Sequence, residues 1–172
     1  SLGPLSTEEQ AAGVLELGRS RRWIDLSRVG VWGWSGGGSN TLNAMFRRPD
    51  VFHVGIAVAP KPQPHLYNAW FQEIYMRTRE ANPEGYKRSA PINFAEGLKG
   101  DLLIIQGTGE TNTHIEITYG LVDRLIALGK SFDLPLKSAG RIGSLALLTG
   151  IASRPLGGGA LVRLGARLTL QV

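Results

Sequence analysis

The fold is decided by residues 28–40, which read RVGVWGWSGGGSN. The first seven of these residues form a short, largely apolar run that predicts a buried strand. The glycines that follow predict a tight turn, and Ser35 lies at this turn between Gly33 and Gly37. Positions without a side chain let the backbone pass closely there. The stretch therefore predicts a serine presented where a strand runs into a helix.

A serine in this setting is a candidate nucleophile. Residues 33–37 fit Gly-x-Ser-x-Gly, the pattern of the nucleophile elbow in α/β-hydrolases. The backbone amide of Gly36, directly after Ser35, can donate a hydrogen bond to an oxyanion. An incidental serine in a glycine-rich turn is the alternative. A phosphate-binding loop is disfavoured, because no Lys-Ser/Thr pair follows and Gly-x-Gly-x-x-Gly is absent.

The acid that would orient a catalytic base should follow a later strand. Residues 101–107, DLLIIQG, predict such a strand, and Glu110 follows it in a short loop before a helical stretch. A glutamate can replace aspartate in this role, because the group only holds and charge-stabilises the imidazole. The alternative is a solvated loop carboxylate.

No residue of the sequence fits the base. The chain has three histidines, and none follows His114, although the base should come after the last strand. His114 lies four residues after Glu110 and is expected to open a helix. His53 and His65 precede the acid, and we expect each to begin a strand or a helix.

Helical and strand patterns alternate along residues 5–136, which predicts an α/β protein with a mostly parallel sheet flanked by helices. We expect a loop at 80–95, and helices at 7–17, 37–46, 65–78 and 115–129, the first of them capped by Ser6. We expect strands at 28–34, 53–59, 101–107 and 131–136. In the helix at 65–78 the predicted apolar side comprises Leu66, Ala69, Trp70, Phe71 and Ile74.

The composition changes after Leu136. Residues 137–172 contain seven glycines and no Asp, Glu, His, Asn or aromatic residue, and neither a strand nor a helix period is sustained. We expect an irregular, low-complexity tail. Translation in a shifted reading frame, a divergent C-terminus and a low-complexity extension all remain open as its origin.

Charge and composition disfavour several classes of function. The net charge of +5 invites a nucleic-acid reading, but five of the 19 Lys and Arg residues lie in the tail. The remaining 14 balance the 14 Asp and Glu residues, so no basic binding face is expected in the first region. The sequence lacks cysteine and any run of 18 apolar residues, and we expect neither a disulfide nor a membrane span. No ligand cluster suggests a metal or an organic cofactor.

Several stretches together resemble the catalytic domain of the prolyl oligopeptidase family of serine peptidases, and its dipeptidyl peptidase IV branch most. They are GVWGWSGGG, PDVFHVGIAVAP, NPEGYKRSAPINFAEGLKGDLLIIQGTGETNTH and LVDRLIALGKSFDL. The resemblance implies that residues 1–136 form part of an α/β-hydrolase domain, with further strands and a β-propeller domain in a longer parent protein. It also implies hydrolysis of short peptides after proline or alanine through an acyl-enzyme, without a cofactor.

The resemblance assigns roles by position. It implies that Ser35 is the nucleophile, that Glu110 stands where the family has its aspartate, and that the Gly36 amide belongs to the oxyanion hole. Tyr67 and Phe71 align with aromatic substrate-pocket positions, although both could equally be core residues of a helix. Asn112 matches an asparagine that borders the substrate carbonyl.

The sequence also departs from the family pattern. Gly36 replaces a tyrosine that walls the pocket, Gln106 replaces a histidine, and Ser39 replaces an aromatic residue. Gly143 stands where the catalytic histidine is expected. We therefore expect this chain to be an incomplete catalytic domain that is inactive by itself. A catalytically dead protein that binds peptides or partners is the alternative, and an esterase is a third reading.

Overall fold

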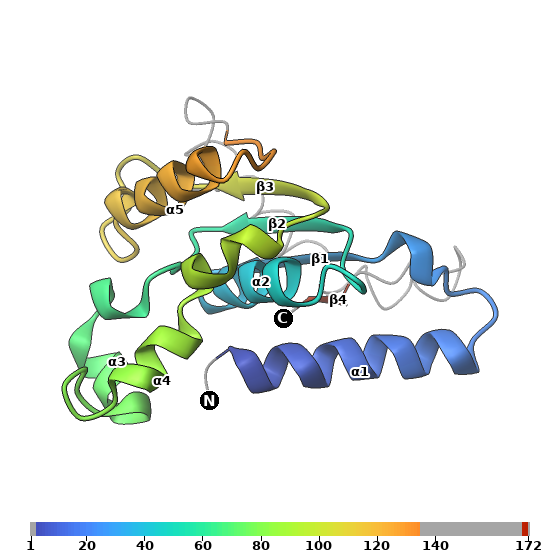
Figure 1. Cartoon of the computed structure of the whole chain (residues 1–172), viewed down its shortest axis with the longest axis horizontal. Coiled ribbons are helices and arrows are strands. Elements are labelled where there is room, and N and C mark those ends of the chain that lie inside the picture. Colours follow the sequence, from blue (N-terminus) through green and yellow to red (C-terminus); the bar gives the residue numbers. More distant parts are fainter. Residues whose placement is uncertain (1–2, 135–169, 172) are drawn as a thin grey trace, which may run out of the picture.

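The computed structural model describes residues 3–134 and 170–171, and its centre is a parallel sheet in the order β3-β2-β1-β4 (Figure 1). The strands are β1 (Gly30–Trp34), β2 (Val54–Val58), β3 (Asp101–Ile105) and β4 (Leu170–Gln171). All three strand pairs are parallel, and β1, β2 and β3 pair along their full length. The α/β class with a parallel sheet is confirmed.

The helices connect and cover these strands. They are α1 (Pro4–Ser20), α2 (Gly36–Arg47), α3 (Ala69–Met76), α4 (Pro83–Ser89) and α5 (Ile115–Ala127), with short 3-10 helices η1 (Leu26–Arg28), η2 (Pro64–Leu66) and η3 (Pro91–Gly97). Helix α2 crosses β1 and β2 and also contacts α1 and η3. The α2 side of the sheet is therefore the covered side.

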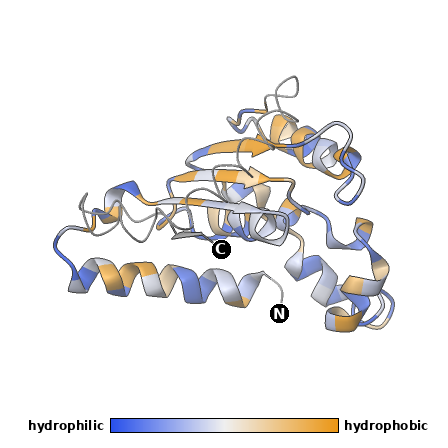
Figure 2. Ribbon diagram, turned by 180° about the vertical axis from the view of Figure 1, so that it is seen from behind, coloured by the Kyte–Doolittle hydropathy of each residue, from blue (hydrophilic) through white to orange (hydrophobic). Residues whose placement is uncertain are grey.

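The core forms between α2 and this side of the sheet. Val31, Ala57 and Ile104 come from three neighbouring strands, and each is at most 4% exposed. Met45 of α2 packs so closely over Gly55 that a Cβ added there would lie 2.5 Å from its side chain. Figure 2 shows apolar residues along the strands and alternating polar and apolar residues along α1, as expected for a helix with one face on a core.

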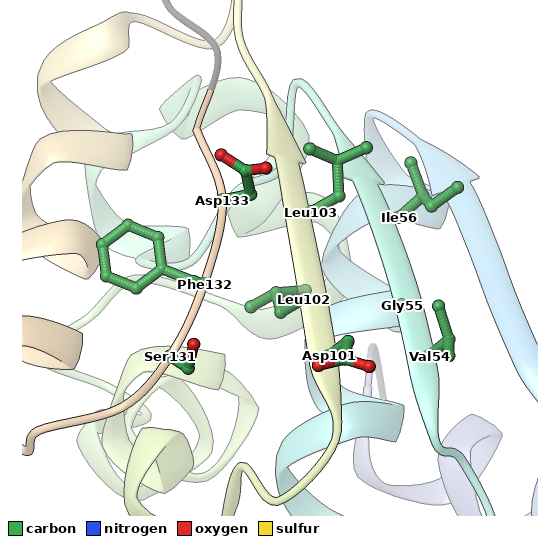
Figure 3. Close-up of a pocket in the computed structure, with 9 residues that line it drawn as sticks. All are labelled: Val54, Gly55, Ile56, Asp101, Leu102, Leu103, Ser131, Phe132 and Asp133. Atoms are coloured by element: carbon green, nitrogen blue, oxygen red, sulfur yellow. The ribbon is translucent and has the colours of Figure 1, made fainter.

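The opposite side of the sheet carries a second, smaller apolar cluster. Val58 and Ile105 are buried there, and Ile56 and Leu103 pack against them. A hollow of about 430 Å³ lies on this side, beside the segment 131–133. Figure 3 shows the residues that line it. This hollow lies away from the Ser35 turn.

The structure corrects several predicted elements. Helix α1 begins at Pro4 rather than at residue 7, and the Ser6 hydroxyl donates to the Gly3 carbonyl (2.9 Å) instead of capping the helix. The reason is Pro4, whose fixed φ and missing N–H suit the first turn of a helix. The predicted loop at 80–95 contains α4 and the start of η3, because the Asn82 side chain caps α4 by accepting from the Gly85 amide (3.1 Å).

The predicted strand at 131–136 is reduced to one isolated bridge between Asp133 and Leu103. Residues 135–136 lie outside the described part, as does most of the predicted irregular tail at 137–172. Leu170 and Gln171, however, pair with β1 as a two-residue strand.

Candidate active site

The β1–α2 turn holds Ser35 in a backbone conformation that non-glycine residues rarely adopt, with φ 55° and ψ −113°. A Cβ added at Gly33 would lie 2.3 Å from the Gly37 backbone, and one added at Gly38 would lie 2.7 Å from the Val58 carbonyl oxygen. The Ser35 amide donates to that same carbonyl (2.8 Å). The close approach explains why glycines surround the serine, and the strand–turn–helix geometry predicted from the sequence is confirmed.

Helix α2 begins directly after the serine, so its N-terminal amides and the positive end of its dipole lie beside Ser35. Gly36 is exposed, and a Cβ added to it would meet no atom within 4 Å among the described residues. A side chain at position 36 would therefore enter open space among the described residues, at the position where the family resemblance implies a tyrosine ring.

A polar connection that the sequence analysis missed joins this turn to the segment after β2. The Ser39 hydroxyl donates to the Ser35 carbonyl (3.2 Å) and accepts from the Lys61 amide (2.8 Å). Ser39 lies four residues, about one helical turn, after Ser35, and this spacing alone predicts that a serine side chain in α2 can reach the Ser35 carbonyl. It fixes where the chain passes after β2.

The three predicted substrate-binding residues lie together. The Tyr67 hydroxyl donates to the Asn112 side-chain oxygen (3.1 Å), which ties the segment before α3 to the loop after β3. The rings of Tyr67 and Phe71 meet edge to face at a centroid distance of 5.9 Å. The Lys61 ammonium lies over both rings, 4.1 Å from the Tyr67 centroid and 4.9 Å from that of Phe71.

Glu110 lies in the loop after β3, at the same carboxyl edge of the sheet as Ser35. Because β2 separates β3 from β1, the two strand ends are roughly 10 Å apart. The Glu110 carboxylate accepts from the Asn112 amide (2.8 Å), so it stabilises its own loop. No hydrogen bond within the described residues joins it to Ser35.

Gln106 also holds this loop in place, a role that the sequence analysis did not assign. It is fully buried, its side-chain amide donates to the Thr113 carbonyl (2.7 Å), and its side-chain oxygen accepts from the Thr118 hydroxyl (3.1 Å). A buried polar side chain with both ends paired positions the loop that carries Glu110 and Asn112.

A sequence model described as "Prolyl oligopeptidase family" matches residues 2–139. The chain belongs to the prolyl oligopeptidase family. It is 36% identical over 134 residues to dipeptidyl peptidase 4 of Trichophyton equinum, a match that covers 77% of this chain and 17% of that protein. The dipeptidyl peptidase 4 of Arthroderma otae is 36% identical over 135 residues, again 77% of this chain and 17% of the relative.

Solved structures agree with this assignment. The crystal structure of Porphyromonas gingivalis dipeptidyl peptidase 4 superposes with a TM-score of 0.76 and 34% sequence identity, covering 79% of this chain and 19% of that one. The family resemblance inferred from the sequence is confirmed. The chain spans about 17% of the length of the curated relatives named above.

His53 and His114 directly precede β2 and α5, as the sequence predicts, whereas the helix predicted to begin at His65 is divided into η2 and α3. The His53 ring nitrogen accepts from the Val29 amide (3.3 Å) at the amino edge of the sheet, opposite to Ser35. His65 lies in η2, where burial and the nearby Arg79 charge lower its pKa, and His114 is the N-cap of α5. Among residues 3–134, no hydrogen bond joins any of the three to Ser35.

In the part of the chain that the structure describes, none of the helices has both the length and the apolar character of a membrane span. The same part also contains no group of three or more His, Cys, Asp or Glu residues arranged to hold a metal ion.

Proposed function

We propose that Ser35 is the nucleophile of a serine peptidase site for short peptides. The observation that supports this most is the strained Ser35 backbone between β1 and α2 in a chain that belongs to the prolyl oligopeptidase family. Such a turn exposes the hydroxyl at the edge of the sheet and beside the amides of a helix N-terminus. Relatives that match the chain carry the name dipeptidyl peptidase 4.

The reaction would proceed in two stages. The Ser35 oxygen attacks the peptide carbonyl, and its proton passes to a base. The Gly36 amide donates to the resulting oxyanion. The C–N bond then breaks, the amine leaves with a proton, and water hydrolyses the acyl-enzyme.

Peptide binding would use the cluster formed by Tyr67, Phe71 and Asn112. The two rings offer an apolar wall, as a proline or alanine side chain requires, and the Asn112 side-chain amide lies beside them. Glu110 would serve as the acid of the site. Its carboxylate accepts a hydrogen bond from the backbone amide of Asn112, so the loop would have to shift before the carboxylate could orient a base. A β-propeller domain in a longer parent protein would restrict access to short peptides, as the family resemblance implies.

The base is the missing component. No histidine follows His114 anywhere in the sequence, and a serine without its base loses most of its reactivity, although oxyanion and binding contributions remain. We therefore propose that the chain by itself is nearly inactive. The same observation favours a second candidate function, peptide binding without turnover.

Chemical rescue separates the two functions. Hydrolysis of alanyl-proline p-nitroanilide by the full chain should be close to background without a base. Added imidazole should raise it in wild type but not in Ser35→Ala, because small imidazole can occupy the place of the absent side chain. Ser35-dependent turnover without imidazole would contradict the missing base. The absence of rescue, together with measurable peptide binding, would favour the binding function.

A further inference from the structure

Lys61 is a cation in an unusual place for a surface lysine. It lies just after β2, beyond Ala59 and Pro60, is half-buried, and its ammonium lies over the rings of Tyr67 and Phe71 at 4.1 and 4.9 Å. Contact with ring faces stabilises an ammonium and holds it in one position. Burial lowers the pKa of Lys61, which indicates that its surroundings leave the charge partly desolvated.

The Lys61 charge has no acidic partner in the described part of the chain. The ion pairs found there join Arg19 to Glu16, and Arg48 to Glu8 and Asp50. A partly buried cation without a carboxylate within 4 Å can gain more from an incoming anion than an exposed lysine would. The partly desolvated Lys61 ammonium can therefore form an ion pair with a carboxylate that approaches from solvent.

Hydrogen bonds also join the Lys61 backbone to the turn that carries the nucleophile. The Lys61 amide donates to the Ser39 hydroxyl, which in turn donates to the Ser35 carbonyl. At Gly36, a Cβ would meet nothing within 4 Å among the described residues, so the space beside the serine is open. The rings under the ammonium are the walls of the proposed peptide site.

We propose that Lys61 is a specificity-determining residue that recognises a carboxylate side chain on the peptide residue whose carbonyl faces Ser35. This inference rests on the proposed function and extends it, because an apolar ring pocket alone would select for proline or alanine. The Lys61 ammonium adds glutamate or aspartate to the side chains accepted there. If Lys61 only covered the rings with its aliphatic side chain, its replacement would change the stability of the protein but not its preference for acidic peptides.

Binding of dipeptide amides by the full 172-residue chain tests the proposal without requiring catalysis. The probes are alanyl-glutamate amide and alanyl-glutamine amide, which differ in one charge and lack the terminal carboxylate that would otherwise compete for Lys61. Titration calorimetry at low salt should show roughly tenfold tighter binding of the glutamate peptide. The preference should weaken as salt is added, since the pair is partly exposed.

Variants identify the residue responsible. Lys61→Met keeps an unbranched apolar stem on the rings and should reduce the preference to within about twofold. Lys61→Glu should reverse the charge preference, so that it favours alanyl-lysine amide. Lys99→Met is the matched control, because Lys99 is exposed near the amino edge of the sheet and carries the same charge. It should leave the preference unchanged.

Equal affinity of wild type for the two amides, or a preference that survives in Lys61→Met, would overturn the proposal. Failure of wild type to bind either amide would overturn it as well. A separate readout, covalent modification of Ser35 by a fluorophosphonate, reports on the nucleophile. If Ser35 is modified while the charge preference is absent, the inference about Lys61 fails and the proposed nucleophile stands.

Discussion

The turn at Ser35 and the segment around α3 both lie at the carboxyl edge of the sheet, but they are held in different ways. The turn is held by backbone contact: Gly33 passes against Gly37, and the Ser35 amide bonds to β2. The α3 segment is held by side chains. Asn68 caps the helix by accepting from the Phe71 amide (3.3 Å), and the Phe71 ring contacts Tyr67 edge to face and Tyr75 at a tilt.

This difference explains why one region was predicted correctly and the other was not. A turn that only glycine can occupy leaves a recognisable pattern in the sequence. A short, half-exposed helix leaves none, because its apolar residues can face either the core or the solvent. Three residues of the predicted apolar side, Leu66, Trp70 and Ile74, are 51%, 74% and 60% exposed. Gln72 and Met76 are buried in their place.

The largest effect is expected from a methyl group at the turn. Gly33→Ala would place its Cβ 2.3 Å from the Gly37 backbone, where nothing flexible can move aside. We expect a loss of about 3 kcal/mol or more in the free energy of unfolding, measured by urea denaturation. Gly36→Ala is the matched control, because its Cβ meets open space, and it should change stability by less than about 1 kcal/mol. Equal effects of the two variants would show that the turn is not sterically held.

A smaller effect should distinguish the two sides of α3. Met76→Ala removes a side chain that is 8% exposed and should cost about 2–3 kcal/mol. Trp70→Ala removes a larger side chain that is 74% exposed, and we expect a change within about 0.5 kcal/mol. Thermal unfolding of both variants measures this. A greater loss for Trp70→Ala would restore the orientation expected from the sequence.

The smallest effect concerns the contact between the two loops. Tyr67→Phe removes the hydroxyl that donates to Asn112 but keeps the ring under Lys61. We expect a loss of about 0.5–1 kcal/mol in stability and no change in the preference for a glutamate peptide. Unfolding of the variant measures the change in stability, and titration calorimetry with the glutamate and glutamine amides measures the preference. A lost charge preference would mean that the hydroxyl, rather than Lys61, governs it.

The sequence predicts the local structure correctly where backbone sterics or burial allow a residue only one conformation. The sequence predicts the turn that holds Ser35 among glycines, the strands β1, β2 and β3, and a helix that opens at His114. The contacts of Lys61 and Gln106 could not be predicted, because each depends on how a loop turns back to place the side chain against the helix that follows it. Helix α4 was missed because a proline and a glycine in seven residues outweighed the Asn82 cap.

The most direct test of the account is covalent modification of the full chain by a fluorophosphonate, with the modified residue located by peptide mass spectrometry. We expect one slow modification, on Ser35, which imidazole accelerates and Ser35→Ala abolishes. Gly36→Ala should retain it, because that substitution leaves the turn intact. Modification of other serines at comparable rates, or an unmodified Ser35 in folded chain with imidazole present, would contradict the assignment of Ser35 as the nucleophile.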